Sequence, residues 1–137
     1  MADCPTTRTL SHPVATMLSL LRWITAVYGV VLTALLLAPN PWALLGLRPP
    51  PGEGSSFGTH FGCFVVLGVL ARWARFSGRP MAWAGALVGY AVLVELGQAL
   101  VPTRSVQWQD LAANLTGLAC GTLLGWAALQ VRNKQHR

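Results

Sequence analysis

Charged residues are scarce in this chain, and acidic residues are the scarcest of all. Lys, Arg, Asp and Glu make up 10% of the 137 residues, and only four are acidic, whereas soluble domains are about one quarter charged. Hydrophobic residues reach 53%. Because one small core cannot bury that much apolar surface, a soluble domain is excluded and a lipid bilayer is the expected environment.

Cysteine is also rare, and the common catalytic signatures are missing. The three cysteines lie far apart, with no Cys-x-x-Cys or Cys/His spacing, so no metal site is predicted. We interpret Cys63 and Cys120, which fall inside apolar runs, as small hydrophobic residues. There is no G-x-S-x-G sequence, no Walker loop, no zinc signature and no evident nucleophile. No cofactor is expected, and the sequence leans away from an enzyme.

Four apolar segments are each about long enough to cross a hydrocarbon core of roughly 30 Å. They predict an all-α fold, a four-helix transmembrane bundle in one membrane domain at residues 17–131, with helices at about 18–38, 57–74, 81–101 and 111–131. Residues 1–16 form a short polar tail, residues 39–56 a proline-rich loop, and residues 132–137 a basic tail. A cleaved signal peptide is the alternative for the first segment, but no suitable cleavage site follows Leu37.

The positive charges predict how the bundle is oriented. The net charge is +6, but the ten cations lie between the apolar segments and form no basic face, so nucleic acid is not an expected partner. If all four segments cross, eight cations share one side and two lie on the other; this bias marks the larger group as cytoplasmic, as are both termini of a multi-pass protein of the cell membrane. The eight are Arg8, Arg22, Arg72, Arg75, Arg79, Arg132, Lys134 and Arg137, and the two are Arg48 and Arg104. The tryptophans gather towards segment ends, as interfacial rings do.

The third segment carries a carboxylate inside the predicted membrane span. Glu95 lies about six residues from the outer end, roughly 9 Å deep, where a charge costs on the order of 2.5–3.5 kcal/mol at the helix centre and less near the edge. Such a residue usually faces the bundle and has a partner. Glu95 and Gln98 share one stripe of this helix, with small residues below them.

The fourth segment has a second stripe, polar at its outer end and rich in glycine below. Asp110 and Asn114 occupy the polar part, and Asp110 also suits a helix cap. We predict an outer-face ligand-binding pocket formed by His60, Glu95, Gln98, Arg104, Asp110 and Asn114. We predict close helix packing at the glycines of the stripe, which are Gly117, Gly121 and Gly125.

These polar residues, taken in order, resemble the signature of VanZ-like membrane proteins. The chain has E-x-x-Q at 95–98, P-x-R at 102–104 and D-x-x-x-N-x-x-G at 110–117, and His60 stands where the family has a histidine. The resemblance covers about residues 57–128. Family members often have an Asp-Lys pair just before that histidine, where this chain has Phe57, Gly58 and Thr59. Membership implies a multi-helix membrane fold and a link to the cell envelope, but no reaction.

Three functions fit these features. The leading hypothesis is an accessory or resistance-type module whose pocket binds the polar head of an amphiphilic envelope ligand, such as a lipid-linked component or a lipoglycopeptide. The second is a membrane-embedded acid/base enzyme acting on a lipid headgroup, with Glu95 or His60 as the proton carrier and Arg104 holding an anion. The third is a structural role, in which the glycine stripe packs against a membrane-protein partner. The lipid bilayer is a partner in all three.

Overall fold

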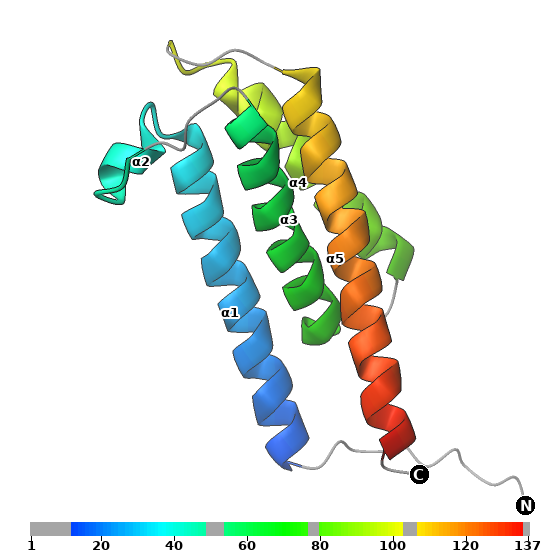
Figure 1. Cartoon of the computed structure of the whole chain (residues 1–137). Coiled ribbons are helices and arrows are strands. Elements are labelled where there is room, and N and C mark those ends of the chain that lie inside the picture. The colour runs from blue at the N-terminus through cyan, green and yellow to red at the C-terminus, as the bar shows by residue number, and fades with distance from the viewer. Residues whose placement is uncertain (1–11, 49–53, 77–79, 103–106, 136–137) are drawn as a thin grey trace, which may run out of the picture.

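The computed structural model describes residues 12–48, 54–76, 80–102 and 107–135, and these form helices without any strand. The four long helices run alternately in opposite directions, so the start of α1 and the end of α5 lie at the same end of the molecule (Figure 1). The predicted all-α class is confirmed. The elements are α1 (His12–Leu37), α2 (Pro41–Leu44), α3 (Gly54–Ala74), α4 (Pro80–Gln98) and α5 (Trp108–Gln135).

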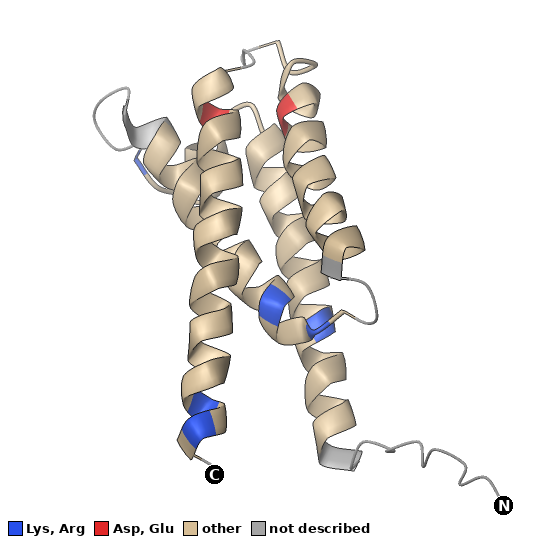
Figure 2. Cartoon of the chain, turned by 90° about the vertical axis from the view of Figure 1, so that its right-hand side faces the viewer, with Lys and Arg blue, Asp and Glu red and all other residues tan. Residues whose placement is uncertain are grey.

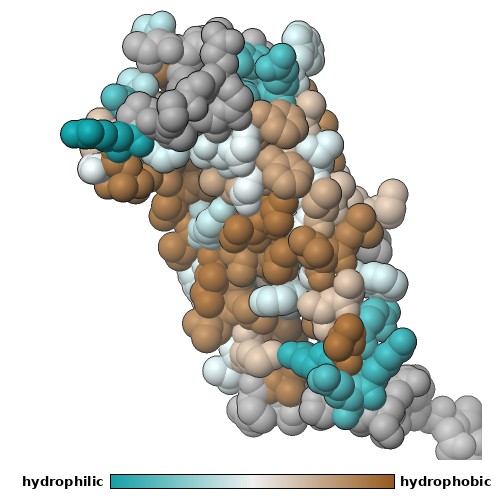
Figure 3. Space-filling model, in the orientation of Figure 1, coloured by the Kyte–Doolittle hydropathy of each residue, from teal (hydrophilic) through white to brown (hydrophobic). Residues whose placement is uncertain are grey.

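The four long helices are also long and apolar enough to cross a membrane. Figure 3 shows a broad hydrophobic surface between two ends at which hydrophilic residues gather. Large apolar side chains of the long helices are exposed, among them Val30 at 70% and Leu93 at 69%. In water such a surface would be unstable, whereas lipid covers it without cost. The predicted transmembrane bundle is confirmed in its helices, while the cytoplasmic location of the termini stays a prediction.

The helix ends differ from the predicted ends by several residues. α1 begins at His12, inside the predicted polar tail, because Pro13 fits a first helical turn. α5 extends from Trp108 to Gln135 and so includes most of the predicted basic tail. α4 ends at Gln98. In the residues that follow, each N–H bonds to the carbonyl three positions earlier, as Val101 N–H does to Gln98 O at 3.0 Å. Hydropathy marks the apolar span, but helices continue past it wherever the backbone groups can still pair.

One short helix lies in the segment that was predicted to be a loop. Asn40 caps α2, since its side-chain oxygen accepts a hydrogen bond from Ala43 N–H at 3.1 Å. Pro41 occupies the first helical turn, where its missing N–H leaves no bond unmade.

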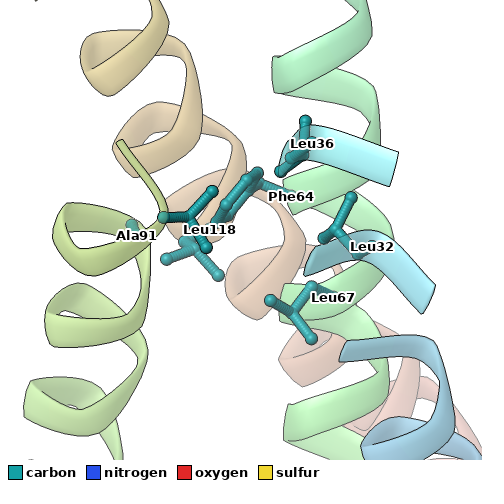
Figure 4. Close-up of a cluster of buried hydrophobic side chains, with 7 residues drawn as sticks. Leu32, Leu36, Phe64, Leu67, Ala91 and Leu118 are labelled. Atoms are coloured by element: carbon teal, nitrogen blue, oxygen red, sulfur yellow. The ribbon is translucent and has the colours of Figure 1, made fainter. Parts of the chain in front are cut away.

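The core lies between the four long helices, and α3 and α5 form its most extensive contact. Phe64 on α3 is fully buried at the centre. The buried side chains around it come from all four long helices (Figure 4), and the labelled ones are Leu32, Leu36, Phe64, Leu67, Ala91 and Leu118. α4 packs mainly through its C-terminal half, whereas the side chains of residues 81–86 are all exposed.

The charges of the described residues separate along the bundle axis (Figure 2). The two described carboxylates, of Glu95 and Asp110, lie at the end opposite to most of the cations. At the cationic end, Arg22 donates to the carbonyl oxygens of Ala74 at 3.3 Å and Arg75 at 3.2 Å. A guanidinium at the end of a helix satisfies carbonyls that have no partner within the helix, so Arg22 fixes α1 to the end of α3.

The orientation can be tested by labelling single cysteines in intact cells. In a variant lacking Cys4, Cys63 and Cys120, we expect Leu47→Cys to react with an impermeant maleimide from outside. We expect Gln135→Cys to react only after the membrane is permeabilised, because the positive-inside bias places that end in the cytoplasm. Both side chains are exposed, so permeabilised cells provide the control for reactivity. The reverse pattern would overturn the predicted topology.

Candidate functional site

His60 lies on α3 and faces two polar side chains of α5. Asp110 and Asn114 are four residues apart and therefore share a face of α5. His60 Nδ1 lies 3.0 Å from Asn114 Oδ1, and His60 Nε2 lies 3.8 Å from Asp110 Oδ2. All three residues are buried, with exposed fractions of 2% for His60, 5% for Asp110 and 0% for Asn114. The structure thus brings three of the predicted site residues together.

The position of Asp110 differs from the predicted helix cap. α5 begins at Trp108, so Asp110 is in the first turn, and the N–H groups of Asp110 and Leu111 bond to Gln107 O at 3.0 and 3.2 Å. A carboxylate in the first turn still interacts favourably with the helix dipole. Its location beside His60 couples this end of α5 to α3.

The hydrogen-bond chemistry of His60 allows two arrangements. If Asn114 Oδ1 accepts from Nδ1–H, then Nε2 can donate towards Asp110 only when the ring is doubly protonated. If the ring is neutral with its proton on Nδ1, then Nε2 is an acceptor and has no hydrogen to offer Asp110. In both arrangements Asn114 Oδ1 fixes the orientation of the imidazole ring, and the Asn114 nitrogen is left without a hydrogen-bond partner among the described residues.

Glu95 binds the start of α5 rather than the His60 group. Its Oε1 accepts a hydrogen bond from Gln107 N–H at 3.0 Å, and the side chain is only 2% exposed. The N-terminus of a helix carries a partial positive charge, so a carboxylate is stabilised there. Its second oxygen, Oε2, is buried without a hydrogen-bond partner among the described residues. The hydrogen bond and the helix dipole offset part of the free-energy cost of placing this carboxylate in the membrane. The second oxygen can still accept a hydrogen bond.

The side chain of Gln98 is hydrogen-bonded to the end of α1. Its side-chain nitrogen donates to Leu36 O at 3.0 Å, and the residue is 1% exposed. Leu36 lies in the last turn of α1, where carbonyl oxygens lack partners within the helix. Gln98 therefore caps α1, which gives it a structural role in addition to the predicted one.

The predicted six-residue pocket is not assembled as one group in the described part of the chain. His60, Asp110 and Asn114 form one cluster, while Glu95 and Gln98 make their hydrogen bonds to Gln107 and Leu36 instead. Arg104 lies outside the described residues. Two cavities lined by described residues lie away from this cluster, one along α1 and one between α1 and α5.

The glycine stripe of α5 lies against α3. A Cβ atom at Gly117 would lie 2.5 Å from Phe61 O, and one at Gly121 would overlap the carbonyl oxygen of Val65. At Gly125 it would lie 3.0 Å from the Cβ of Arg72. The sequence analysis missed the matching glycine on α3, Gly68, whose Cβ would lie 2.7 Å from Leu118 O. The two backbones are too close to leave room for a side chain at these positions. The glycines therefore fix how α3 is rotated and shifted along α5, and so where His60 lies relative to α5.

Hydroxyl groups inside the apolar runs add bonds that the sequence analysis also missed. Tyr28 OH donates to Cys63 O at 2.9 Å, which ties α1 to α3. Thr33 Oγ1 and Tyr90 OH lie 2.9 Å apart, which ties α1 to α4. The available signal was a Tyr and a Thr within an apolar run, since hydroxyls in lipid seek partners on neighbouring helices.

A comparison with known families gives one match, to the model described as VanZ/LLP1, which covers residues 6–129. The matched range includes α1 to α4 and most of α5, together with all the polar residues described above. No curated protein and no solved structure matches the chain significantly.

Proposed function

The chain belongs to the VanZ/LLP1 family, and from this premise we propose that it binds the polar head of an amphiphilic envelope component at the His60 end of its membrane bundle. The ligand class is a lipid-linked envelope precursor or a lipoglycopeptide. The protein acts as an accessory or resistance-type module of the cell membrane, with the bilayer holding the apolar part of the ligand. The proposal rests on the unpaired polar atoms at this end of the bundle.

The observation that carries the proposal is the side-chain nitrogen of Asn114. This atom is buried and has no hydrogen-bond partner among the described residues. An unpaired buried donor costs about 1–3 kcal/mol, so an asparagine with only a packing role would be a poor choice beside so many leucines. A ligand acceptor would satisfy the donor and recover that free energy.

The second unpaired atom narrows the ligand chemistry. Glu95 Oε2 is an acceptor that lacks a donor, whereas Asn114 Nδ2 is a donor that lacks an acceptor. A head that offers both donors and acceptors, such as a sugar or a peptide, matches the pair. A head with acceptors only, such as a bare phosphate, matches Asn114 but would repel Glu95.

The surrounding surface suits the apolar part of such a ligand. Leu96 and Leu100 lie on or just after the same stretch of α4 as Glu95, and they are 56% and 86% exposed. An acyl or prenyl chain can lie along these side chains while the head reaches inward. A soluble head without a chain would lose this contribution, which is about 0.8 kcal/mol for each buried methylene.

The enzyme alternative is favoured by a different observation, the His60–Asp110 pair. A histidine held by Asn114 on one nitrogen and facing a carboxylate with the other is an arrangement that can move protons. The structural alternative is weakened, because α3 of the same chain already fills the glycine stripe. The stripe is therefore not free to receive a separate protein.

Native mass spectrometry of the whole chain, extracted from its own membranes, tests the proposal. We expect the wild type to retain an envelope amphiphile and Asn114→Leu to retain about five- to tenfold less, since one hydrogen bond is lost. Asn114→Asp keeps an acceptor for His60 Nδ1 but lacks the donor, so it should also lose the ligand. Thr116→Val is the control. Thr116 is on the same helix, and its hydroxyl bonds to the backbone of that helix at Ala112 O and Ala113 O.

Melting temperatures in the same detergent separate binding from folding. Ligand loss at an unchanged melting temperature in either Asn114 variant supports the site. Equal retention by the wild type and both Asn114 variants would contradict it. A chemically altered amphiphile, released only by the wild type, would instead support the enzyme alternative.

A further inference from the structure

A cavity of about 430 Å³ lies at the other end of the bundle, between α1 and α5. It arises because α3 ends at Ala74, whereas α1 and α5 continue beyond that level (Figure 1). Arg75 has a positive φ of 42°, a left-handed conformation that ends α3. Beyond the end of α3, the ends of α1 and α5 border a space, and its volume falls within the roughly 300–1,000 Å³ of typical ligand sites.

The wall of this cavity is apolar, and its charged residues are all cations. The apolar lining comes from one face of α1 and one face of α5, and it consists of Val14, Met17, Leu18, Leu21, Ala128 and Leu129. Trp73, Arg75 and Arg132 complete the lining. Trp73 is fixed by a bond of 3.3 Å from its Nε1 to Gly125 O. An apolar chamber that carries two guanidinium groups is suited to an amphiphile with a negative head.

The two arginines have no carboxylate to neutralise them in the described part of the chain. The described carboxylates, of Glu95 and Asp110, are at the opposite end of the bundle (Figure 2). Arg22, which lies nearby, is already bound to the carbonyls of Ala74 and Arg75. Cations that lack protein partners, lie at a helix end and flank an apolar space attract an anionic headgroup.

From these observations we propose that the cavity is a binding site for one anionic phospholipid. The phosphate lies between Arg75 and Arg132, because a guanidinium binds phosphate oxygens through paired N–H donors. The acyl chains occupy the apolar space between α1 and α5. This site is separate from the proposed ligand site, since it lies at the opposite end of the bundle and uses none of the same residues.

Charge complementarity favours a lipid over a second copy of the chain. The described residues at the ends of α3 and α5 include the cations Arg72, Arg75, Arg132 and Lys134, so two copies meeting here would bring like charges together. An anionic lipid supplies the missing negative charge and the apolar chains in one molecule. The bound lipid then bridges two helices that make little direct contact with each other.

Native mass spectrometry with defined lipids tests the site. The purified full chain is loaded with phosphatidylglycerol, with phosphatidylcholine, or with inorganic phosphate alone. We expect one phosphatidylglycerol to be retained and about 25-fold less retention in the double variant Arg75→Gln/Arg132→Gln, at about fivefold for each cation. Lys134→Gln is the matched control, because it removes one cation from the same helix without touching the cavity.

A second pair of variants tests the apolar space. Ala128→Phe should fill the cavity and expel the lipid, whereas Ala127→Phe, on an exposed neighbouring position that does not line the cavity, should retain it. Equal retention of phosphatidylcholine and phosphatidylglycerol, or binding of phosphate alone, would overturn the proposal. Unchanged retention of phosphatidylglycerol in the double arginine variant would also overturn it. So would a dimer of the wild type that Ala128→Phe disrupts.

Discussion

Gly121→Leu is expected to force α5 away from α3 and to lower the free energy of unfolding by about 3 kcal/mol or more. A Cβ at this position already overlaps the carbonyl oxygen of Val65. That atom belongs to a helical backbone and cannot move aside as a flexible side chain would. The whole helix must shift, and the contact between α3 and α5 is the most extensive in the bundle. Thermal unfolding in detergent measures the effect.

The control is Leu123→Ala, two residues further along the same helix. Leu123 is 66% exposed and faces lipid, so its truncation should change the free energy of unfolding by less than about 0.5 kcal/mol. Equal losses of stability in Gly121→Leu and Leu123→Ala would show that the stripe does not pack against α3.

Two alanine variants make a sharper comparison on the same helix pair. Gly121→Ala adds only one methyl group but places it against Val65, so it should destabilise the bundle. Gly62→Ala adds the same methyl where nothing lies within 4 Å, so the gain in helix propensity should stabilise the bundle by about 0.4–1 kcal/mol. The same added methyl group is therefore expected to lower the free energy of unfolding in Gly121→Ala and to raise it in Gly62→Ala.

The helices could be predicted from the sequence because the bilayer imposes a length and a hydropathy on each one. The four apolar segments and the scarcity of charge are visible without any tertiary information. Helix ends were less predictable, as α1 and α5 show, because the chain stays helical in the interfacial region where hydropathy has already fallen.

The partners of the polar residues could be predicted only in part. The spacing of Asp110 and Asn114 put both on one face of α5, and the glycines continue that face, so a common contact followed from periodicity. The sequence could not show that Gln98 would reach Leu36 O or that Glu95 would reach Gln107 N–H. Those bonds depend on the rotation and height of α4 against its neighbours, which side-chain packing over the whole bundle determines.

Glu95→Gln is expected to keep the fold and to weaken ligand retention at the His60 end. The amide oxygen of glutamine can still accept from Gln107 N–H, so the link between α4 and α5 stays in place. The neutral side chain also inserts more easily, because a carboxylate costs on the order of 2.5–3.5 kcal/mol at mid-membrane and somewhat less near the edge. Membrane abundance should therefore match the wild type.

Two further substitutions separate the roles of this carboxylate. Glu95→Leu removes the acceptor for Gln107 N–H and should destabilise the bundle by about 1–3 kcal/mol. Leu93→Gln places an amide on an exposed position of the same helix and controls for added polarity. Glu95→Gln should fold as well as the wild type, and Leu93→Gln should still retain the ligand.

The decisive quantity is ligand retention by Glu95→Gln at equal membrane abundance. Its Oε2 has no partner among the described residues, so a donor on the ligand is the group that would bind it. A hydrogen bond to a charged acceptor contributes about 1.5–3 kcal/mol, and its loss should weaken retention by about 10- to 100-fold. Native mass spectrometry of the two proteins from the same membranes gives the comparison. Wild-type retention in Glu95→Gln would mean that the charge serves only the start of α5, and the ligand site would then reduce to His60, Asp110 and Asn114.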